Sequence, residues 1–212
     1  MKHCLFGRRS CSLGVFSALV VVVSGLSAGP ALAKATSSYG PPPDTSGCSS
    51  PQLSQPFLAL GDLNFYTLVP GQSIGSFDGT GWTLRAGAQI ETQPLADGAS
   101  GSVLDLPSGS QAVSPPMCVS SDYPTGRTLV RDVVGSQGVQ MYVSYAGTNT
   151  QDKPQNIGQV HGQQSSWTVS DPFNIHPGNL SGWQLVQFTL VPGGKTSDFQ
   201  IYDFYVDPRM KG

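Results

Sequence analysis

Residues that could carry out catalysis are few in this 212-residue chain. Glu91 is the only glutamate, and neither His161 nor His176 stands in a zinc-binding spacing such as His-Glu-x-x-His. No Gly-x-Ser-x-Gly motif lies between a predicted strand and a predicted helix, the context that exposes a nucleophilic serine. Aspartates such as Asp97 and Asp171 precede Gly or Pro, where their usual role is to form turns. The sequence therefore predicts a protein that is not an enzyme, with a hydrolase as the alternative.

Side chains suited to sugar binding occur near the middle of the chain. Tyr142 lies on the polar side of the alternating segment 139–145, between Gln140 and Ser144. Proteins recognise sugars with exposed aromatic rings and with polar side chains that bond the hydroxyl groups. We therefore predict that Tyr142, Arg131 and Gln140 form a polar-aromatic patch on one sheet face; a solvated sheet surface is the alternative. The three tryptophans stand beside apolar residues, which predicts that they belong to the core.

The first 33 residues have the pattern of a secretory signal peptide. Lys2, Arg8 and Arg9 precede an apolar segment, 13–26, and Ala31-Leu32-Ala33 forms a cleavage site. The apolar segment is short for a membrane span and is interrupted by small residues. We therefore expect a secreted, extracellular protein with no membrane span after cleavage; an uncleaved membrane anchor is the alternative.

The mature chain has the size and charge of one acidic domain. Removing 33 of the 212 residues leaves 179, enough to bury a sizeable core. Lys plus Arg falls from 11 to 8 against 13 Asp plus Glu, so the net charge becomes about −5. Because no cluster of Lys and Arg remains, neither nucleic acid nor an anionic membrane surface is an expected partner.

Two cysteines, Cys48 and Cys118, remain after cleavage. An oxidising compartment allows them one intramolecular pairing, so we predict a disulfide between them, with two separate thiols as the alternative. The bond would close a loop of about 71 residues and contribute about 4 kcal/mol to stability, less any strain. The preceding segment, 34–47, contains three consecutive prolines and little to bury, which predicts a disordered leader before a folded domain at 48–212.

Short runs of β-branched and aromatic residues, separated by Gly and Pro, fill the mature chain. They predict extended segments at 65–70, 81–85, 88–92, 102–106, 115–119, 126–134, 139–145, 158–161, 166–169, 183–191 and 199–207. No window of the mature chain shows convincing helical periodicity. This pattern predicts an all-β sandwich, a jelly roll in the first place and an immunoglobulin-like sandwich as the alternative.

The last segment is the most strand-like and is apolar on both sides. Strict alternation would place one apolar set, Phe199, Ile201 and Tyr205, opposite the other, Tyr202, Phe204 and Val206. Asp203 interrupts the first set. A strand of this kind is usually covered on both faces.

Several short motifs resemble a family of secreted bacterial proteins, mostly of uncharacterised activity, with a galactose-binding-like jelly-roll domain. The motifs are Leu68-Val69-Pro70-Gly71, Gly81-Trp82-Thr83-Leu84, Ser102-Val103-Leu104-Asp105-Leu106-Pro107, Ser114-Pro115-Pro116-Met117-Cys118-Val119 and Gln200-Ile201-Tyr202-Asp203-Phe204-Tyr205-Val206-Asp207-Pro208. The resemblance covers the domain loosely from Cys48 to Pro208. It implies a jelly roll of the type found in carbohydrate-binding modules.

The same resemblance bears on a structural calcium. In the wider superfamily, acidic residues before the Gly-Trp strand often join an aspartate of the last strand around the ion. Here Ser73 and Gly75 stand at the two acidic positions, and only Asp203 matches. Calcium prefers about six to eight oxygen ligands. Because two of the expected carboxylates are absent, we expect no bound cofactor; a structural calcium with Asp203 as a ligand, and Asp62 and Asp78 as substitute ligands, is the alternative.

Two kinds of function follow from these observations. The first is a non-catalytic extracellular module that binds a glycan or cell-wall polymer, suggested by the fold resemblance and by exposed Tyr and Gln side chains. The second is a structural or protein-interaction protein of the cell surface with no small ligand, because no sharp site emerges. Jelly rolls serve many functions, so fold alone does not decide between them.

Overall fold

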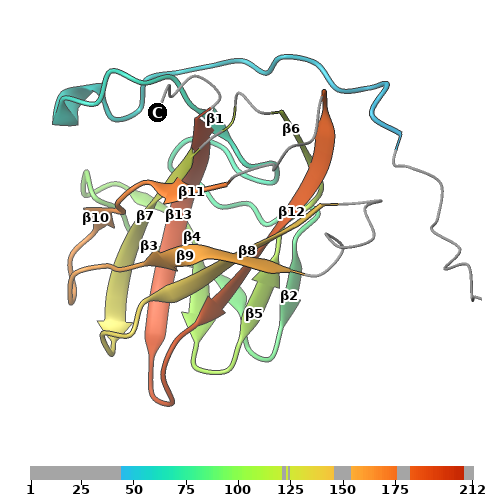
Figure 1. Ribbon diagram of the computed structural model, residues 1–212. Helices are drawn as coiled ribbons and strands as arrows, with labels where there is room; N and C mark the ends of the chain where they lie inside the picture. The colour runs from blue at the N-terminus through green and yellow to red at the C-terminus, as the bar shows by residue number, and fades with distance from the viewer. Residues whose placement is uncertain (1–43, 121–122, 124, 146–153, 176–181, 208–212) are drawn as a thin grey trace, which may run out of the picture. The chain divides into compact units, whose positions relative to one another are not determined.

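The computed structural model describes residues 44–120, 123, 125–145, 154–175 and 182–207 (Figure 1). The chain divides into two units, Met1–Ser37 and Ser38–Gly212, and every described residue belongs to the second. The predicted signal peptide and most of the predicted leader lie outside the described residues. Among the described residues, no helix has the length and apolar character needed to cross a membrane.

Seven strands form one antiparallel sheet. They are β1 (Thr67–Leu68), β3 (Gln89–Pro94), β4 (Ser100–Pro107), β7 (Thr125–Val134), β10 (Thr168–Val169), β11 (Phe173–Asn174) and β13 (Asp198–Asp207). Five run in the order β10-β7-β13-β4-β3, while β1 pairs with β13 and β11 pairs with β7. The central strands β7 and β13 pair from Asp198 opposite Val134 to Asp207 opposite Thr125.

Six strands form the second antiparallel sheet. They are β2 (Thr83–Arg85), β5 (Gln111–Val113), β6 (Met117–Val119), β8 (Val139–Tyr145), β9 (Gln155–Val160) and β12 (Gln184–Pro192). Their order is β2-β5-β12-β8-β9, and β6 also pairs with β12. A short 3-10 turn, η1 (Leu58–Leu60), precedes all the strands.

The two sheets pack face to face as a jelly-roll β-sandwich, as the sequence predicts (Figure 1). In β8, Met141 and Val143 are buried while Gln140 and Tyr142 are half-buried, which is the expected alternation of a strand with one face in the core. Across the sandwich, the rings of Phe188 in β12 and Phe204 in β13 lie 5.0 Å apart.

The predicted disulfide is confirmed. Cys48 is bonded to Cys118, 70 positions later in the chain, with the Cα atoms 5.7 Å apart. The bond fastens the start of the folded unit to β6. Because it closes a long loop, it restricts the unfolded chain and so stabilises the fold.

A β-bulge at Asp203 corrects the predicted alternation of β13. Tyr202 lies opposite Leu129 and Tyr205 lies opposite Arg127, so β13 has one residue more than β7 over this stretch. Asp203 takes up the extra residue with a φ of 52°. As a result Phe204 joins the main core with Phe199 and Ile201, and Tyr205 belongs to a separate small cluster.

The strand predictions were right for the long segments and incomplete for short ones. The strands β5 and β11 lie outside the segments predicted from the sequence. The strand β9 begins at Gln155, three residues before the predicted start at 158. Strands of two or three residues have too few side chains to show a period, so tertiary pairing decides whether they form.

Candidate functional site

A polar groove of about 610 Å³ lies on the outer face of the seven-stranded sheet. Strands β3, β4, β7 and β13 provide most of its lining, which consists of Gln89, Glu91, Gln93, Asp105, Pro107, Arg131, Val133, Ser165, Asp198 and Gln200. Register explains why these side chains meet: Asp105 lies opposite both Gln89 and Gln200, and Gln200 lies opposite Arg131. Paired residues in adjacent strands share one face of the sheet.

Arg131 orients two glutamines in this groove. Its Nε donates to Oε1 of Gln200 at 2.8 Å, and its Nη2 donates to Oε1 of Gln93 at 3.0 Å. Because a guanidinium can only donate, the oxygen of each amide must face Arg131. The NH₂ groups of both glutamines are therefore directed elsewhere.

Two carboxylates receive those NH₂ groups and close the network. Glu91 accepts from Gln93 at 3.0 Å and from Gln89 at 2.7 Å. Asp105 accepts from Gln200 at 2.9 Å and from Gln89 at 3.4 Å. We call this closed circuit the polar ring; its members are Arg131, Gln93, Glu91, Gln89, Asp105 and Gln200. Its charged members fix the direction of every amide.

Trp167 covers one side of the polar ring. The Arg131 guanidinium carbon lies 4.7 Å from the centre of the Trp167 ring, a cation–π contact. The indole also meets the Tyr202 ring edge-on at 4.7 Å, and its Nε1 donates to the Pro94 carbonyl at 2.8 Å. Trp82 is buried, as predicted for a core tryptophan, whereas Trp167 and Trp183 are only half-buried.

Asp198 adds a third carboxyl group to the groove. Burial raises the pKa of Asp198 to about 6, together with the negative charge of Asp105, a side-chain hydrogen bond with Asp105 and the negative charge of Glu91. Its buried Oδ1 has no hydrogen-bond partner among the described residues. The groove therefore contains one carboxylate that lacks the donors its two neighbours have.

The residues of the predicted polar-aromatic patch lie in two different sheets, so they do not share one sheet face as predicted. Arg131 lies in β7 of the seven-stranded sheet, whereas Tyr142 and Gln140 lie in β8 of the six-stranded sheet. Gln140 is instead hydrogen-bonded to Gln159 and Asn156. Alternation gave the outward side of each strand correctly but not the sheet to which the strand belongs.

Most of the polar ring was missed by sequence reasoning. A usable signal was present in β3, where Gln89, Glu91 and Gln93 alternate with Ile90 and Thr92. Three polar residues at a spacing of two indicate one polar sheet face. The contributions of the distant strands carried no comparable signal.

The surroundings of Asp203 do not match a calcium site. Asp203 is buried, and its Oδ1 accepts a hydrogen bond at 2.8 Å from the backbone N–H of Gly75, the position where the resemblance implies a glutamate. Burial raises the pKa of Asp203 to about 6. No three His, Cys, Asp or Glu side chains gather for a metal within the described residues. Asp203 as a metal ligand remains a prediction from the resemblance.

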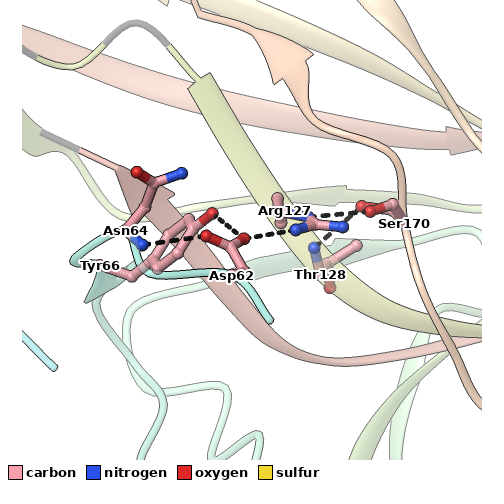
Figure 2. Close-up of polar contacts among 6 residues, drawn as sticks. All are labelled: Asp62, Asn64, Tyr66, Arg127, Thr128 and Ser170. Atoms are coloured by element: carbon pink, nitrogen blue, oxygen red, sulfur yellow. Dashed lines mark hydrogen bonds and ion pairs between the residues drawn. The ribbon is translucent and has the colours of Figure 1, made fainter. Parts of the chain in front are cut away.

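Asp62, a further calcium candidate, belongs to a second polar cluster (Figure 2). Its carboxylate accepts from the Tyr66 hydroxyl at 2.7 Å, from the Asn64 N–H at 3.0 Å and from Arg127. Arg127 also donates to the Ser170 carbonyl at 3.1 Å. Burial alone would raise the pKa of Asp62, but these donors lower it below its ordinary value. The cluster fastens the segment before β1 to β7.

A serine motif near β1 does not form a nucleophile site. The segment Gly71-Gln72-Ser73-Ile74-Gly75 matches the Gly-x-Ser-x-Gly motif. It forms a turn, however, and the next element is the strand β2 and not a helix. Ser73 and Ser76 exchange backbone hydrogen bonds, and the Ser73 hydroxyl bonds Asp78 at 3.4 Å. Within the part of the chain that the structure describes, no histidine is hydrogen-bonded to Ser73.

Comparison with known proteins gives a similarity of fold only. No protein-family model matches the chain, and no curated protein matches it. Among solved structures, the CBM22-2 xylan-binding domain from Paenibacillus barcinonensis Xyn10C is 11% identical with a TM-score of 0.45, and the match covers 68% of this chain and 98% of that one. Another xylan-binding domain, from CBM 22, is 15% identical with a TM-score of 0.44, covering 69% and 96%.

A third similar structure belongs to a larger enzyme. The CBM22-1–GH10 modules of the Clostridium thermocellum xylanase 10B are 16% identical with a TM-score of 0.42. The match covers 60% of this chain, which spans only 26% of that one. Likeness at this level concerns the arrangement of strands and assigns neither a ligand nor a site.

Proposed function

We propose that this protein is a secreted, non-catalytic module that binds an extracellular glycan or cell-wall polymer in the polar groove. The observation that supports this proposal is the polar ring beside Trp167. Sugars present many hydroxyl groups on rings with apolar faces, and proteins bind them with fixed polar side chains next to aromatic surface. The polar ring supplies the first kind of surface within the groove, and Trp167 supplies the second beside it, against Arg131.

The side chains of the polar ring are already oriented by their hydrogen bonds, so a ligand has to order few of them when it binds. Gln200 and Asp105 line the groove and are only 4% and 5% exposed, so packing within the sheet restricts both side chains. Ordering a mobile side chain on binding costs about 0.5–1.5 kcal/mol. A groove whose glutamines are already held by Arg131 avoids part of this cost.

The test is calorimetric titration of the mature protein with soluble glycans and cell-wall fragments. We expect saturable binding to at least one class and a loss of about tenfold or more in affinity for Arg131→Ala, since two glutamines lose their orientation. Gln140→Ala on the other sheet is the matched control and should bind normally. Equal losses in the two variants, or no binding to any glycan, would refute the proposal.

A protein-binding function is the second candidate, and an apolar surface supports it. Leu58, Leu60 and Leu63 are 51%, 69% and 69% exposed, and Ile74 is 74% exposed. Leu60 and Ile74 line a hollow of about 430 Å³. Exposed apolar side chains that gather in one region often mark a protein interface. Leu60→Ser with Ile74→Ser should leave glycan binding intact and abolish only capture of a protein partner.

A further inference from the structure

Carboxylate oxygens in the polar groove have unused capacity to accept hydrogen bonds. Each carboxylate offers about four acceptor positions. Glu91 and Asp105 each receive two donors from glutamines, and Oδ1 of Asp198 receives none among the described residues. A ligand rich in N–H or O–H donors would complete these positions.

The groove also has an excess of negative charge. Glu91, Asp105 and Asp198 line it, and among the described lining residues Arg131 is the only basic one. Two nitrogens of Arg131 already bond Gln200 and Gln93, and Trp167 lies over its guanidinium. Arg131 is therefore occupied by the two glutamines and the indole. The carboxylates of Glu91, Asp105 and Asp198 have no other basic residue beside them in the described groove lining.

Asp198 is the group for which a cation would matter most. Burial is the largest cause of its raised pKa. Asp105 in β4 and Glu91 in β3 are both negatively charged and raise this pKa further. A positive group placed among these three carboxylates would favour their ionised forms. A neutral sugar hydroxyl would supply donors but no charge.

We propose that the groove selects glycans that carry free amino groups, with the sugar ammonium bound by Asp198 and favoured by the negative charges of Asp105 and Glu91 in the same groove. This inference rests on the proposed function, because it names the class of glycan that the same groove takes. An ammonium provides three donors and one positive charge, which match the unused acceptors and the charge excess. N-acetylation removes the charge, and a uronic acid adds repulsion.

The experiment compares two oligosaccharides that differ only in acetylation. A glucosamine hexasaccharide and an N-acetylglucosamine hexasaccharide are titrated into the mature protein at low and high salt. We expect the free amine to bind about tenfold tighter or more at low salt, and the difference to shrink at high salt because salt screens charge attraction.

Two variants locate the preference. Asp198→Asn should reduce the preference for the amine by about threefold or more, since the neutral amide no longer attracts the ammonium. Asp171→Asn, which removes a charge from a residue outside the groove lining, is the matched control and should keep it. Thermal unfolding checks that Asp198→Asn folds, and the salt dependence of the unmodified protein tests the inference even if it does not.

The outcomes separate this inference from the proposed function. A salt-sensitive preference for the amine that needs Asp198 supports it. Binding of the acetylated or a neutral glycan with equal or greater affinity, lost in Arg131→Ala, would overturn the selectivity and leave glycan binding intact. Absence of binding to every glycan would overturn both.

Discussion

The outer faces of the two sheets differ in how they hold amide side chains. In the six-stranded sheet, Gln140 bonds Gln159 and Asn156, and Arg85 is the only charged residue in its strands. In the seven-stranded sheet, three glutamines connect Arg131 with Glu91 and Asp105. Neutral amides can pair in either direction, whereas a cation and two carboxylates fix the direction of the amides between them.

This difference indicates which face is prepared for a ligand. A fixed network keeps its donors and acceptors in place before binding. A neutral amide cluster has several hydrogen-bonding arrangements, and binding a ligand must restrict it to one of them at a cost in entropy. The seven-stranded face also has a groove and Trp167 at its side. The contrast between charged and neutral networks can be tested with single substitutions on each face.

The largest effect is expected from Gln200→Ala. This change leaves Arg131 Nε and Asp105 Oδ1 without their shared partner in a buried position. We expect a loss of about 2 kcal/mol in unfolding free energy, measured by urea denaturation, and a loss of about thirtyfold in glycan affinity. Gln140→Ala should cost less than about 0.5 kcal/mol. Similar losses of unfolding free energy in Gln200→Ala and Gln140→Ala would contradict the difference between the two sheet faces.

Trp167→Ala should have the next largest effect. The substitution removes the aromatic surface over Arg131 and exposes the polar ring to water. We expect glycan affinity to fall by about tenfold, because a cation–π contact and an aromatic sugar platform are lost together. Trp183→Ala, which removes an aromatic residue that packs against Tyr123 and not against Arg131, is the control. Unchanged affinity in Trp167→Ala would exclude the indole from the site.

A smaller effect is expected from Asp203→Asn, and it depends on pH. Burial raises the pKa of Asp203 from 3.8 to about 6, so between these values the folded state binds more protons than the unfolded state. The unfolding free energy should therefore fall as pH rises from about 4 to about 6.

Asparagine removes the buried charge but keeps an oxygen for the Gly75 N–H and tolerates a φ of 52°. At pH 7 the variant should be more stable by on the order of 1 kcal/mol, with a flatter pH profile from urea denaturation. If calcium stabilised the unmodified protein, and the variant were less stable at pH 7 and gained less from calcium, the result would instead support a metal role for Asp203.

The smallest effect is expected from Tyr142→Ala. Tyr142 lies on the six-stranded sheet, away from the polar ring in the strand order. We expect glycan affinity to change by less than about twofold in the same titrations. A large loss would place a binding site on the six-stranded face, as the sequence-based prediction for Tyr142 would have it.

Local pattern determined much of the fold. Alternation in 139–145 identified the buried side of β8, Gly and Pro marked the turns, and two cysteines left one disulfide to form. These properties depend on neighbouring residues or on simple counting, so a single sequence reveals them. The short strands β5 and β11 could not be predicted, because two or three residues are too few to show a period.

The polar ring could be predicted only in part. The alternation of Gln89, Glu91 and Gln93 was readable, but Asp105, Arg131 and Gln200 join them through strand pairing. For the same reason Arg131 and Tyr142 were placed together although they lie in different sheets. Alternation shows the side on which a residue projects and not which strand is its neighbour.

The sequence by itself determined an all-β chain, the disulfide between Cys48 and Cys118, and the inward or outward side of most long strands. Only the tertiary structure decided the two sheets, the bulge at Asp203 and the closed circuit of charged and amide side chains. The physical reason is that strand pairing joins residues far apart in the chain, and the geometry of a ring built from four strands exists only after those strands have paired.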